Sequence, residues 1–217
     1  YSSGSVSVTE RKPDGELGSQ AARVQHVGSS VNAKRQASPH AHSVNLSLDN
    51  KFVYAADLGT DEMISYQFGE AGTLTRSSKL DMAKGAGPRH FALNPATPHG
   101  YVINELSSTI TVVAREATTG ELTAVQEITT LPRDFSGRSN TAEVCVAKNG
   151  KFVYGSNRGH DSIAVYRVEE DRLLMMIQIQ KLKGKTPRNF VIDPTGRFLL
   201  AAAQASNWIE VFAIDES

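Results

Sequence analysis

The sequence predicts an all-β chain built from repeated four-stranded units, the organisation of a β-propeller. Four segments of the chain align with one another, and one shared position in them is held by Tyr54, Tyr101, Tyr154 and Leu200. The steps between these residues are 47, 53 and 46 residues, close to the repeat of roughly 40–50 residues that is typical of propeller blades. Short apolar runs alternate with turn residues, and no stretch has a sustained helical period.

Each unit is expected to contain four strands joined by hairpin turns. In the first complete unit these strands are predicted over residues 43–47, 52–56, 63–68 and 79–83. In the first of them Val44 and Leu46 alternate with polar residues, the period of two that is typical of a half-buried strand. Clusters of Asn, Asp, Gly and Pro follow each first strand, at 48–50, 94–98, 148–150 and 193–196. More polar fourth strands are expected again near 125–130 and 176–181.

The repeat predicts one incomplete propeller domain over residues 1–217. Its parts are a partial blade at 1–35, blades at 36–84, 85–135 and 136–183, and a partial blade at 184–217. About four blades in an open arc suggest a fragment of a longer ring, because propellers close with four to eight blades. In such an arc the apolar face around Val6 and Val8 is expected to be exposed to solvent. The strand with Val211, Phe212 and Ile214 is expected to have an edge whose backbone groups are not paired with another strand. A β-sandwich, the alternative, gives no reason for shared turns at matching positions.

Composition excludes several functional classes. The chain has 23 basic and 23 acidic residues, and zero net charge argues against a nucleic-acid or anionic-membrane partner. A single cysteine excludes a disulfide framework and a multi-thiolate metal site. The longest apolar run, 198–203, is too short to span a bilayer, and residues 1–5 lack the features of a signal peptide. We expect a cytoplasmic protein, and the oligomeric state stays open.

Polar residues that differ between repeats mark a candidate site. In a propeller the first strand of each blade lines the channel and the second returns beside it, so first-strand starts and second-strand ends share one mouth. The starts carry His42-Ser43, Arg89-His90, Ala142-Glu143 and Arg188-Asn189. The ends carry Asp57-Leu58, Asn104-Glu105, Asn157-Arg158 and Ala203-Gln204. Scaffold positions such as Phe52, Phe152 and Phe198 repeat, whereas these positions vary, as expected of a ligand site.

The residue types at this mouth suit a small anionic substrate. Arg89, Arg158 and Arg188 would supply permanent cations for a carboxylate or phosphate. His42 and Glu105 are titratable groups able to move a proton near neutral pH. The alternative is that the arginines are solvated surface charges and that Glu105 only neutralises one of them.

Other motifs are interpreted as structural. The glycine-containing loop 85–89 resembles an anion-binding loop, but no helix follows, which favours a connection between blades. Residues 57–61 lack the ligand spacing of a calcium loop and are predicted to form a turn. His40 and His42 have no evident third metal ligand, and Cys145 is predicted to be a core thiol.

Several short motifs together resemble the seven-bladed propeller lactonase family, over essentially the whole chain. They are Ser38-Pro-His-Ala-His-Ser-Val, Gly85-Ala-Gly-Pro-Arg-His-Phe, Tyr101-Val-Ile-Asn-Glu-Leu, Gly155-Ser-Asn-Arg, Thr186-Pro-Arg-Asn-Phe and Ala202-Ala-Gln. That family includes propeller-type 6-phosphogluconolactonases and 3-carboxy-cis,cis-muconate lactonizing enzymes. The resemblance implies an enzyme that acts on a lactone ring without a metal or cofactor. It implies catalytic roles for His42, Arg89, Glu105 and Arg158.

The resemblance favours hydrolysis of 6-phosphogluconolactone to 6-phosphogluconate, a step of the pentose phosphate pathway. Substrate contacts are expected from His90, Asn104, Asn157, Arg188 and Gln204. The general base is open between Glu105 and His42. One alternative is a carboxymuconate lactonizing cycloisomerase that uses the same mouth for a tricarboxylate. A non-enzymatic interaction platform is the other, and an aromatic content of 7% weighs against it.

Overall fold

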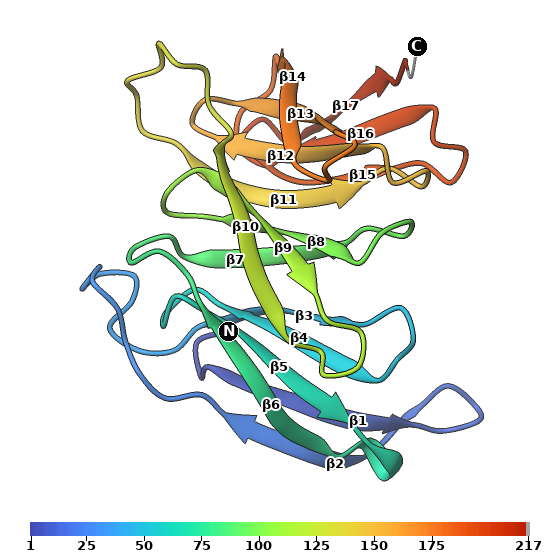
Figure 1. The fold of residues 1–217 in the computed structure, drawn as a ribbon. Coiled ribbons are helices and arrows are strands. Elements are labelled where there is room, and N and C mark those ends of the chain that lie inside the picture. The colour runs from blue at the N-terminus through green and yellow to red at the C-terminus, as the bar shows by residue number, and fades with distance from the viewer. Residues whose placement is uncertain (216–217) are drawn as a thin grey trace. The chain divides into compact units, whose positions relative to one another are not determined.

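The computed structural model describes residues 1–215 and confirms the all-β, propeller-type fold (Figure 1). Within these residues the strands form antiparallel sheets, and the helical structure is one short 3-10 helix, η1 (Glu70–Gly72). Residues 216–217 of the predicted last blade lie outside the described residues. The chain divides into two compact units, Tyr1–Pro88 with Arg115–Thr123 and Arg89–Ala114 with Ala124–Ser217. Across residues 1–215 no helix is long and apolar enough to cross a membrane.

The first unit contains a two-stranded and a four-stranded sheet. The strands are β1 (Ser5–Arg11), β2 (Leu17–Gln25), β3 (Ala41–Leu46), β4 (Phe52–Asp57), β5 (Glu62–Phe68) and β6 (Leu74–Asp81). The four-stranded sheet has the order β3-β4-β5-β6. Val6 of β1 is 5% exposed and packs with Val53, Ile64 and Tyr66 of that sheet. The prediction that Val6 is exposed to solvent is therefore wrong, because the neighbouring sheet covers this residue.

The second unit contains most of three further sheets, whose strands run in chain order (Figure 1). The strands are β7 (Pro88–Leu93), β8 (His99–Asn104), β9 (Thr109–Arg115), β10 (Leu122–Thr129), β11 (Asn140–Val146), β12 (Phe152–Arg158), β13 (Ser162–Val168), β14 (Leu174–Lys181), β15 (Pro187–Ile192), β16 (Phe198–Ala203) and β17 (Trp208–Ala213). The last sheet has three strands, and β17 is its outer strand. Val211 on this outer strand is 59% exposed, as expected for an open edge.

Neighbouring sheets of the second unit bury each other's faces. One core cluster joins Tyr101 and Ile110 of the β7–β10 sheet to Val153 and Tyr166 of the β11–β14 sheet. A second cluster joins the β11–β14 sheet to the β15–β17 sheet, with Phe190 at 2% exposure. Each large apolar side chain buried in this way stabilises the fold by about 1.5–3 kcal/mol. The packing explains why a single repeat could not fold alone.

The predicted register of the repeats is confirmed. Tyr54, Tyr101, Tyr154 and Leu200 are each the third residue of a second strand, in β4, β8, β12 and β16. The three tyrosines are at most 4% exposed. The fourth residue, Leu200, is half-buried. A position that holds a buried tyrosine in three sheets is one that packing constrains, and this is why the alignment was visible in the sequence.

A left-handed residue precedes the third strand of each sheet from β3 onward. These residues are Asp61, Ser108, Asp161 and Asn207, with φ between 54° and 57°. Asn and Asp tolerate this conformation better than most residues. The residue at this position ends a tight turn and sets the start of the following strand.

Asp61 also binds the segment that follows β6, the last strand of its own sheet. Its carboxylate accepts hydrogen bonds from the backbone N–H of Gly85 (2.6 Å) and of Gly87 (2.7 Å). Its carbonyl accepts the N–H of Met82 (2.8 Å). Asp161 repeats the arrangement, with its carboxylate bound to the N–H of Thr186 (2.8 Å). The loop 85–89 is thus a connection whose N–H groups bind an anion, and that anion is a side chain of the protein.

The first strands carry an irregularity near their starts. The pairing register shifts between Ala41 and Ser43 in β3, and between Pro187 and Asn189 in β15. In β11 the shift lies between Thr141 and Val144. His42, Ala142-Glu143 and Arg188 fall inside these shifts. A β-bulge bends the strand and re-aims a side chain, and bulges are common beside functional sites.

Strand β3 has the predicted period of two, but its apolar residues lie on the more exposed face of the strand and its polar residues on the less exposed face. Val44 and Leu46 are about half exposed, at 54% and 49%, whereas Ser47 is buried. Ser47 directly follows β3, and its hydroxyl accepts the N–H of Lys51 (3.1 Å) and of Phe52 (2.9 Å) and closes the turn to β4. These contacts explain why this polar residue is buried.

Candidate active site

Three predicted site residues meet in the second unit. Arg89 lies at the start of β7, Glu105 directly follows β8, and Arg158 ends β12. The Nε of Arg89 donates to Oε2 of Glu105 at 2.9 Å, and the Nη2 of Arg158 lies 3.0 Å from the same oxygen. One carboxylate therefore bridges two guanidinium groups that are 69 residues apart in the sequence.

The irregular start of β11 anchors this cluster through backbone groups. Arg89 Nη1 donates to the carbonyl of Ala142 (2.6 Å), and Arg158 Nη2 donates to that of Thr141 (2.7 Å). The carbonyl of Glu105 accepts the N–H of Thr141 (3.3 Å). The register shift leaves Ala142 without a pairing partner on β12, so its carbonyl can accept from Arg89, while Thr141 just before the shift binds Arg158.

Burial strengthens the electrostatic interactions between the three charged side chains of this cluster. The side chains of Arg89 and Glu105 are 3% and 4% exposed, and that of Arg158 is 15% exposed. Burial and the nearby charge of Arg158 lower the pKa of Arg89, and Glu105 opposes the shift. Arginine still stays charged, since its pKa begins far above neutral. Two cations at about 3 Å stabilise the Glu105 carboxylate as an anion. Glu105 is thus a counter-ion that both arginines share, and its single charge leaves the cluster net positive.

A second chain of contacts extends from Arg89 to two neighbouring sheets. Arg89 Nη1 lies 3.1 Å from His90 Nε2, and His90 Nδ1 lies 2.7 Å from Oε1 of Glu143 on β11. Asn189 on β15 donates from Nδ2 to the other carboxylate oxygen of Glu143. Glu143 was not among the predicted site residues. Its alignment with His90 and Asn189 at first-strand starts is the signal that could have identified it.

Two predicted binding residues are buried and already hydrogen-bonded. Asn104 is 0% exposed and donates to the hydroxyls of Thr109 and Thr111, each at 2.9 Å. Asn157 is also 0% exposed and exchanges hydrogen bonds with Thr130, at 2.6 and 2.7 Å. These contacts support a structural role for both amides, which hold the ends of their second strands.

The other predicted residues lie apart from the Arg89–Glu105–Arg158 cluster or in the other unit. Arg188 on β15 and Gln204 after β16 are exposed. Arg188 still acts on Arg89 through its charge. His42 belongs to the first unit, where it lies in the irregular start of β3 with its ring edge-on to that of Tyr1. Among residues 1–215 no group of three or more His, Cys, Asp or Glu side chains could hold a metal ion.

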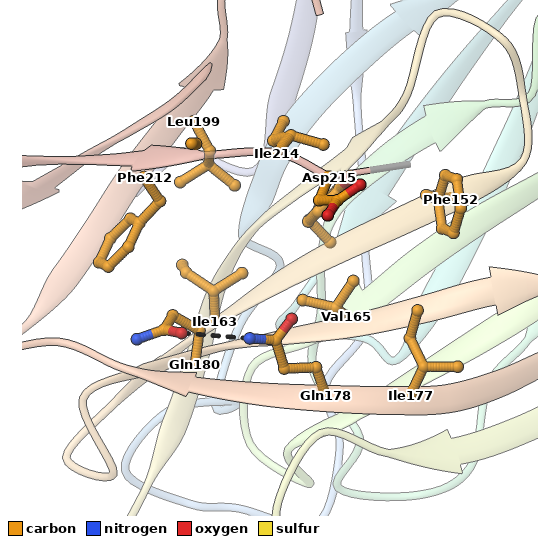
Figure 2. A pocket seen from close by; sticks show the side chains of 12 residues that line it. Phe152, Ile163, Val165, Ile177, Gln178, Gln180, Leu199, Phe212, Ile214 and Asp215 are labelled. Atoms are coloured by element: carbon orange, nitrogen blue, oxygen red, sulfur yellow. Dashed lines mark hydrogen bonds between the residues drawn. The ribbon is translucent and has the colours of Figure 1, made fainter. Parts of the chain in front are cut away.

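A pocket of about 270 Å³ lies elsewhere in the second unit, between the β11–β14 and β15–β17 sheets. Figure 2 shows apolar side chains such as Ile163, Val165 and Phe212 around it, with Gln178 and Gln180 hydrogen-bonded to each other. None of the predicted site residues lines this pocket. Its lining also includes Asp215 and holds no lysine or arginine, which does not suit an anionic substrate.

Sequence comparison identifies related proteins along the whole chain. The family described as "Lactonase, 7-bladed beta-propeller" matches residues 1–217. A 6-phosphogluconolactonase of Bacillus subtilis is 36% identical over 217 residues, which are 100% of this chain and 62% of the relative. A 6-phosphogluconolactonase of Pectobacterium carotovorum is 35% identical over 81% of this chain and 54% of its own length.

Solved structures agree with this relationship. A Lactobacillus plantarum protein superposes with a TM-score of 0.95 at 32% identity, covering 100% of this chain and 62% of its own. The periplasmic gluconolactonase PpgL of Pseudomonas aeruginosa gives 0.90 at 30% identity, covering 97% and 60%. The chain thus spans a little over half to about three fifths of the length of these relatives. From the family match over all 217 residues, the chain belongs to the seven-bladed β-propeller lactonase family.

Proposed function

We propose that this chain carries the active site of a lactone hydrolase whose substrate is 6-phosphogluconolactone and whose product is 6-phosphogluconate. The observation that carries the proposal is the buried Arg89–Glu105–Arg158 cluster, in which one carboxylate bridges two guanidinium groups. The name of the Bacillus subtilis relative supports the choice of substrate. We place the reaction in the cytoplasm, as part of the pentose phosphate pathway, with no cofactor.

Hydrolysis of a lactone needs stabilisation of the negative charge that develops on the carbonyl oxygen. Arg158 is the better placed of the two bridged arginines, since its side chain is 15% exposed against 3% for Arg89. The Nε of Arg158 is buried and has no hydrogen-bond partner among the described residues. An unsatisfied buried donor costs about 1–3 kcal/mol, and an oxygen of the substrate would satisfy it. The cluster therefore suits an oxyanion or a carboxylate.

A phosphorylated sugar lactone needs a further cationic contact. Arg188 is exposed, and its charge is close enough to Arg89 to affect the pKa of that residue. Guanidinium groups bind phosphate through paired hydrogen bonds. We assign the phosphate contact to Arg188, and the ring carbonyl to Arg158.

The test is an assay of the purified full-length protein on two lactones. One substrate is 6-phosphogluconolactone generated from glucose 6-phosphate, and the other is unphosphorylated glucono-δ-lactone, because one structural neighbour is a gluconolactonase. Release of 6-phosphogluconate is followed with its dehydrogenase, against the spontaneous rate. We expect faster hydrolysis of the phosphorylated lactone. If both lactones are hydrolysed no faster than spontaneously, the proposal is refuted. If the unphosphorylated lactone is hydrolysed faster, the protein is a lactone hydrolase whose substrate is not 6-phosphogluconolactone.

Two substitutions sharpen this test. Arg158→Gln should lower kcat/KM by about 10- to 100-fold, the equivalent of one charge-assisted hydrogen bond of about 1.5–3 kcal/mol. Arg188→Gln should raise KM for the phosphorylated lactone and leave the unphosphorylated one unaffected. Arg197→Gln is the matched control, since Arg197 precedes β16 at the end opposite to Ala203 and stacks on Phe198. Equal effects of Arg188→Gln on both lactones would exclude a phosphate contact.

A further inference from the structure

We propose that His90 and Glu143 are positioning residues, which hold the Arg89 guanidinium in the geometry that the reaction needs. This inference rests on the proposed lactone hydrolysis and assigns neither residue a contact with the reacting atoms. The starting observation is that both ring nitrogens of His90 are engaged. Nε2 lies 3.1 Å from Arg89 Nη1, and Nδ1 lies 2.7 Å from Oε1 of Glu143. A ring bonded in this way holds its neighbours and has no lone pair left for a water proton.

The two partners of His90 fix the tautomer of its ring. An arginine side chain has only donors, so Nε2 accepts from Arg89. An ionised carboxylate has only acceptors, so the N–H at Nδ1 donates to Glu143. Both contacts require the same neutral tautomer, with the proton on Nδ1. The ring thereby transmits the direction of a fixed carboxylate to its other partner, as carboxylates behind metal-binding histidines also do.

Glu143 is a fixed anchor for this ring, because groups from three strands hold it. Asn189 on β15 donates to its Oε2. The N–H of Val144 on β11 donates to Oε1 at 3.2 Å, and the hydroxyl of Ser156 on β12 accepts the backbone N–H of Glu143 at 3.0 Å. Its side chain is 12% exposed. These contacts leave the carboxylate little freedom to turn, as a positioning role requires.

The His90 ring supplies one of three contacts that hold the Arg89 guanidinium. The other two are the carboxylate of Glu105, at 2.9 Å from Nε, and the carbonyl of Ala142, at 2.6 Å from Nη1. Arg89 is 3% exposed, so it acts on a substrate through its charge and through Glu105, whose Oε2 also lies 3.0 Å from Arg158. A shift of Arg89 would therefore move the carboxylate that holds Arg158, the residue to which we assign the ring carbonyl.

Glu143 also supplies a negative charge that the Arg89–Glu105–Arg158 cluster lacks. The cluster carries two positive charges and one negative charge, and a net charge is costly to bury. Glu143 is separated from Arg89 by one neutral imidazole, and its charge offsets the remaining positive one. The chain of contacts thus contains one carboxylate for each arginine, which lowers the cost of burying both.

The experiment is a double-mutant cycle on kcat and KM in the full-length protein, with both lactones as substrates. His90→Leu keeps an apolar side chain of similar size but has no group that accepts from Arg89. It should lower kcat by at least about 10-fold for both lactones with KM nearly unchanged, because misplaced groups at the carbonyl slow the chemical step. His90→Gln has an amide oxygen that can accept from Arg89, and should keep most of the activity. In Arg89→Lys protein, which has already lost this contact, His90→Leu should change kcat by less than about 2-fold.

Two further variants complete the set. Glu143→Leu removes the anchor and should lower kcat as His90→Leu does, and the two substitutions together should cost little more than either alone. His99→Leu is the matched control and should leave kcat unchanged, since His99 starts β8 at the end opposite to Asn104. Urea unfolding of each variant shows whether it is folded.

The outcomes separate this inference from the proposed function. Unchanged kcat in folded His90→Leu, with only stability lowered, would overturn the inference and leave lactone hydrolysis standing. The same holds for a full additional loss in the Arg89→Lys background. A wild type without lactonase activity would overturn both. Nitrogen NMR of the wild-type protein needs no variant to fold. It should show the neutral His90 ring protonated on Nδ1, and a resonance typical of the Nε2–H tautomer would refute the assigned contacts.

Discussion

Replacing Glu105 with glutamine would remove the negative charge from between Arg89 and Arg158 with little change in shape. At separations near 3–4 Å each ion pair is worth about 4 kcal/mol at an effective dielectric constant of 20, before the loss of hydration is counted. Removing one partner of a buried pair destabilises a protein by about 3–5 kcal/mol, because the remaining charge stays buried. The glutamine oxygen can still accept one hydrogen bond. We therefore expect Glu105→Gln to lower the free energy of unfolding by about 3 kcal/mol.

Urea unfolding of the full-length protein measures this quantity, with Glu127→Gln as an exposed control expected to change it by about 0.5 kcal/mol or less. A double-mutant cycle with Arg158→Gln isolates the contact. If one carboxylate pairs with both arginines, the double variant should be less destabilised than the sum of the single variants, by about 1–3 kcal/mol. A Glu105→Gln effect below about 1 kcal/mol, or strict additivity, would refute the reasoning.

Three further predictions concern stability and reactivity. Burial acts to raise the pKa of Asp57, but hydrogen bonds from His26 and from backbone N–H groups outweigh it and lower the pKa from its ordinary value of 3.8. Its stabilisation is therefore present above that value and lost as pH falls, so Asp57→Asn should destabilise by about 3 kcal/mol at pH 7 and by less near pH 3 in melting experiments. Asp81→Asn, in an exposed ion pair, is the control. Gly155→Val should cost about 1–3 kcal/mol in urea unfolding, because a Cβ there would lie 3.2 Å from two isoleucine methyl groups in the core. Burial raises the pKa of Cys145 to about 12, so native protein at pH 8 should react slowly with a thiol reagent and unfolded protein rapidly.

The fold could be predicted because packing repeats. Tyr54, Tyr101 and Tyr154 occupy equivalent buried positions, and such positions are visible as a repeat in the sequence. The outermost strands were predicted too short, since β6 begins at Leu74 rather than near residue 79. Outer strands are largely polar, so the alternation that reveals a strand is weak there. The covering of Val6 was missed because it depends on contacts between sheets.

The candidate site could be predicted only in part. Repeat positions that vary in residue type pointed to Arg89, Glu105 and Arg158, and these three do meet. The same rule also selected Asn104 and Asn157, because an alignment cannot distinguish a side chain that faces the mouth from one that closes a turn. The partnership of His90 with Glu143 depends on the register shift in β11. The sequence carries no visible mark of that shift.

The contacts of Asp61 have a consequence for resistance to proteolysis. The exposed Lys84 lies between Met82 and Gly85, and both of these donate backbone hydrogen bonds to Asp61. If trypsin cut after Lys84, the two new chain ends would each remain bound to the same aspartate. A nicked protein of this kind would keep its sheets assembled, and the cut would be detected only after denaturation.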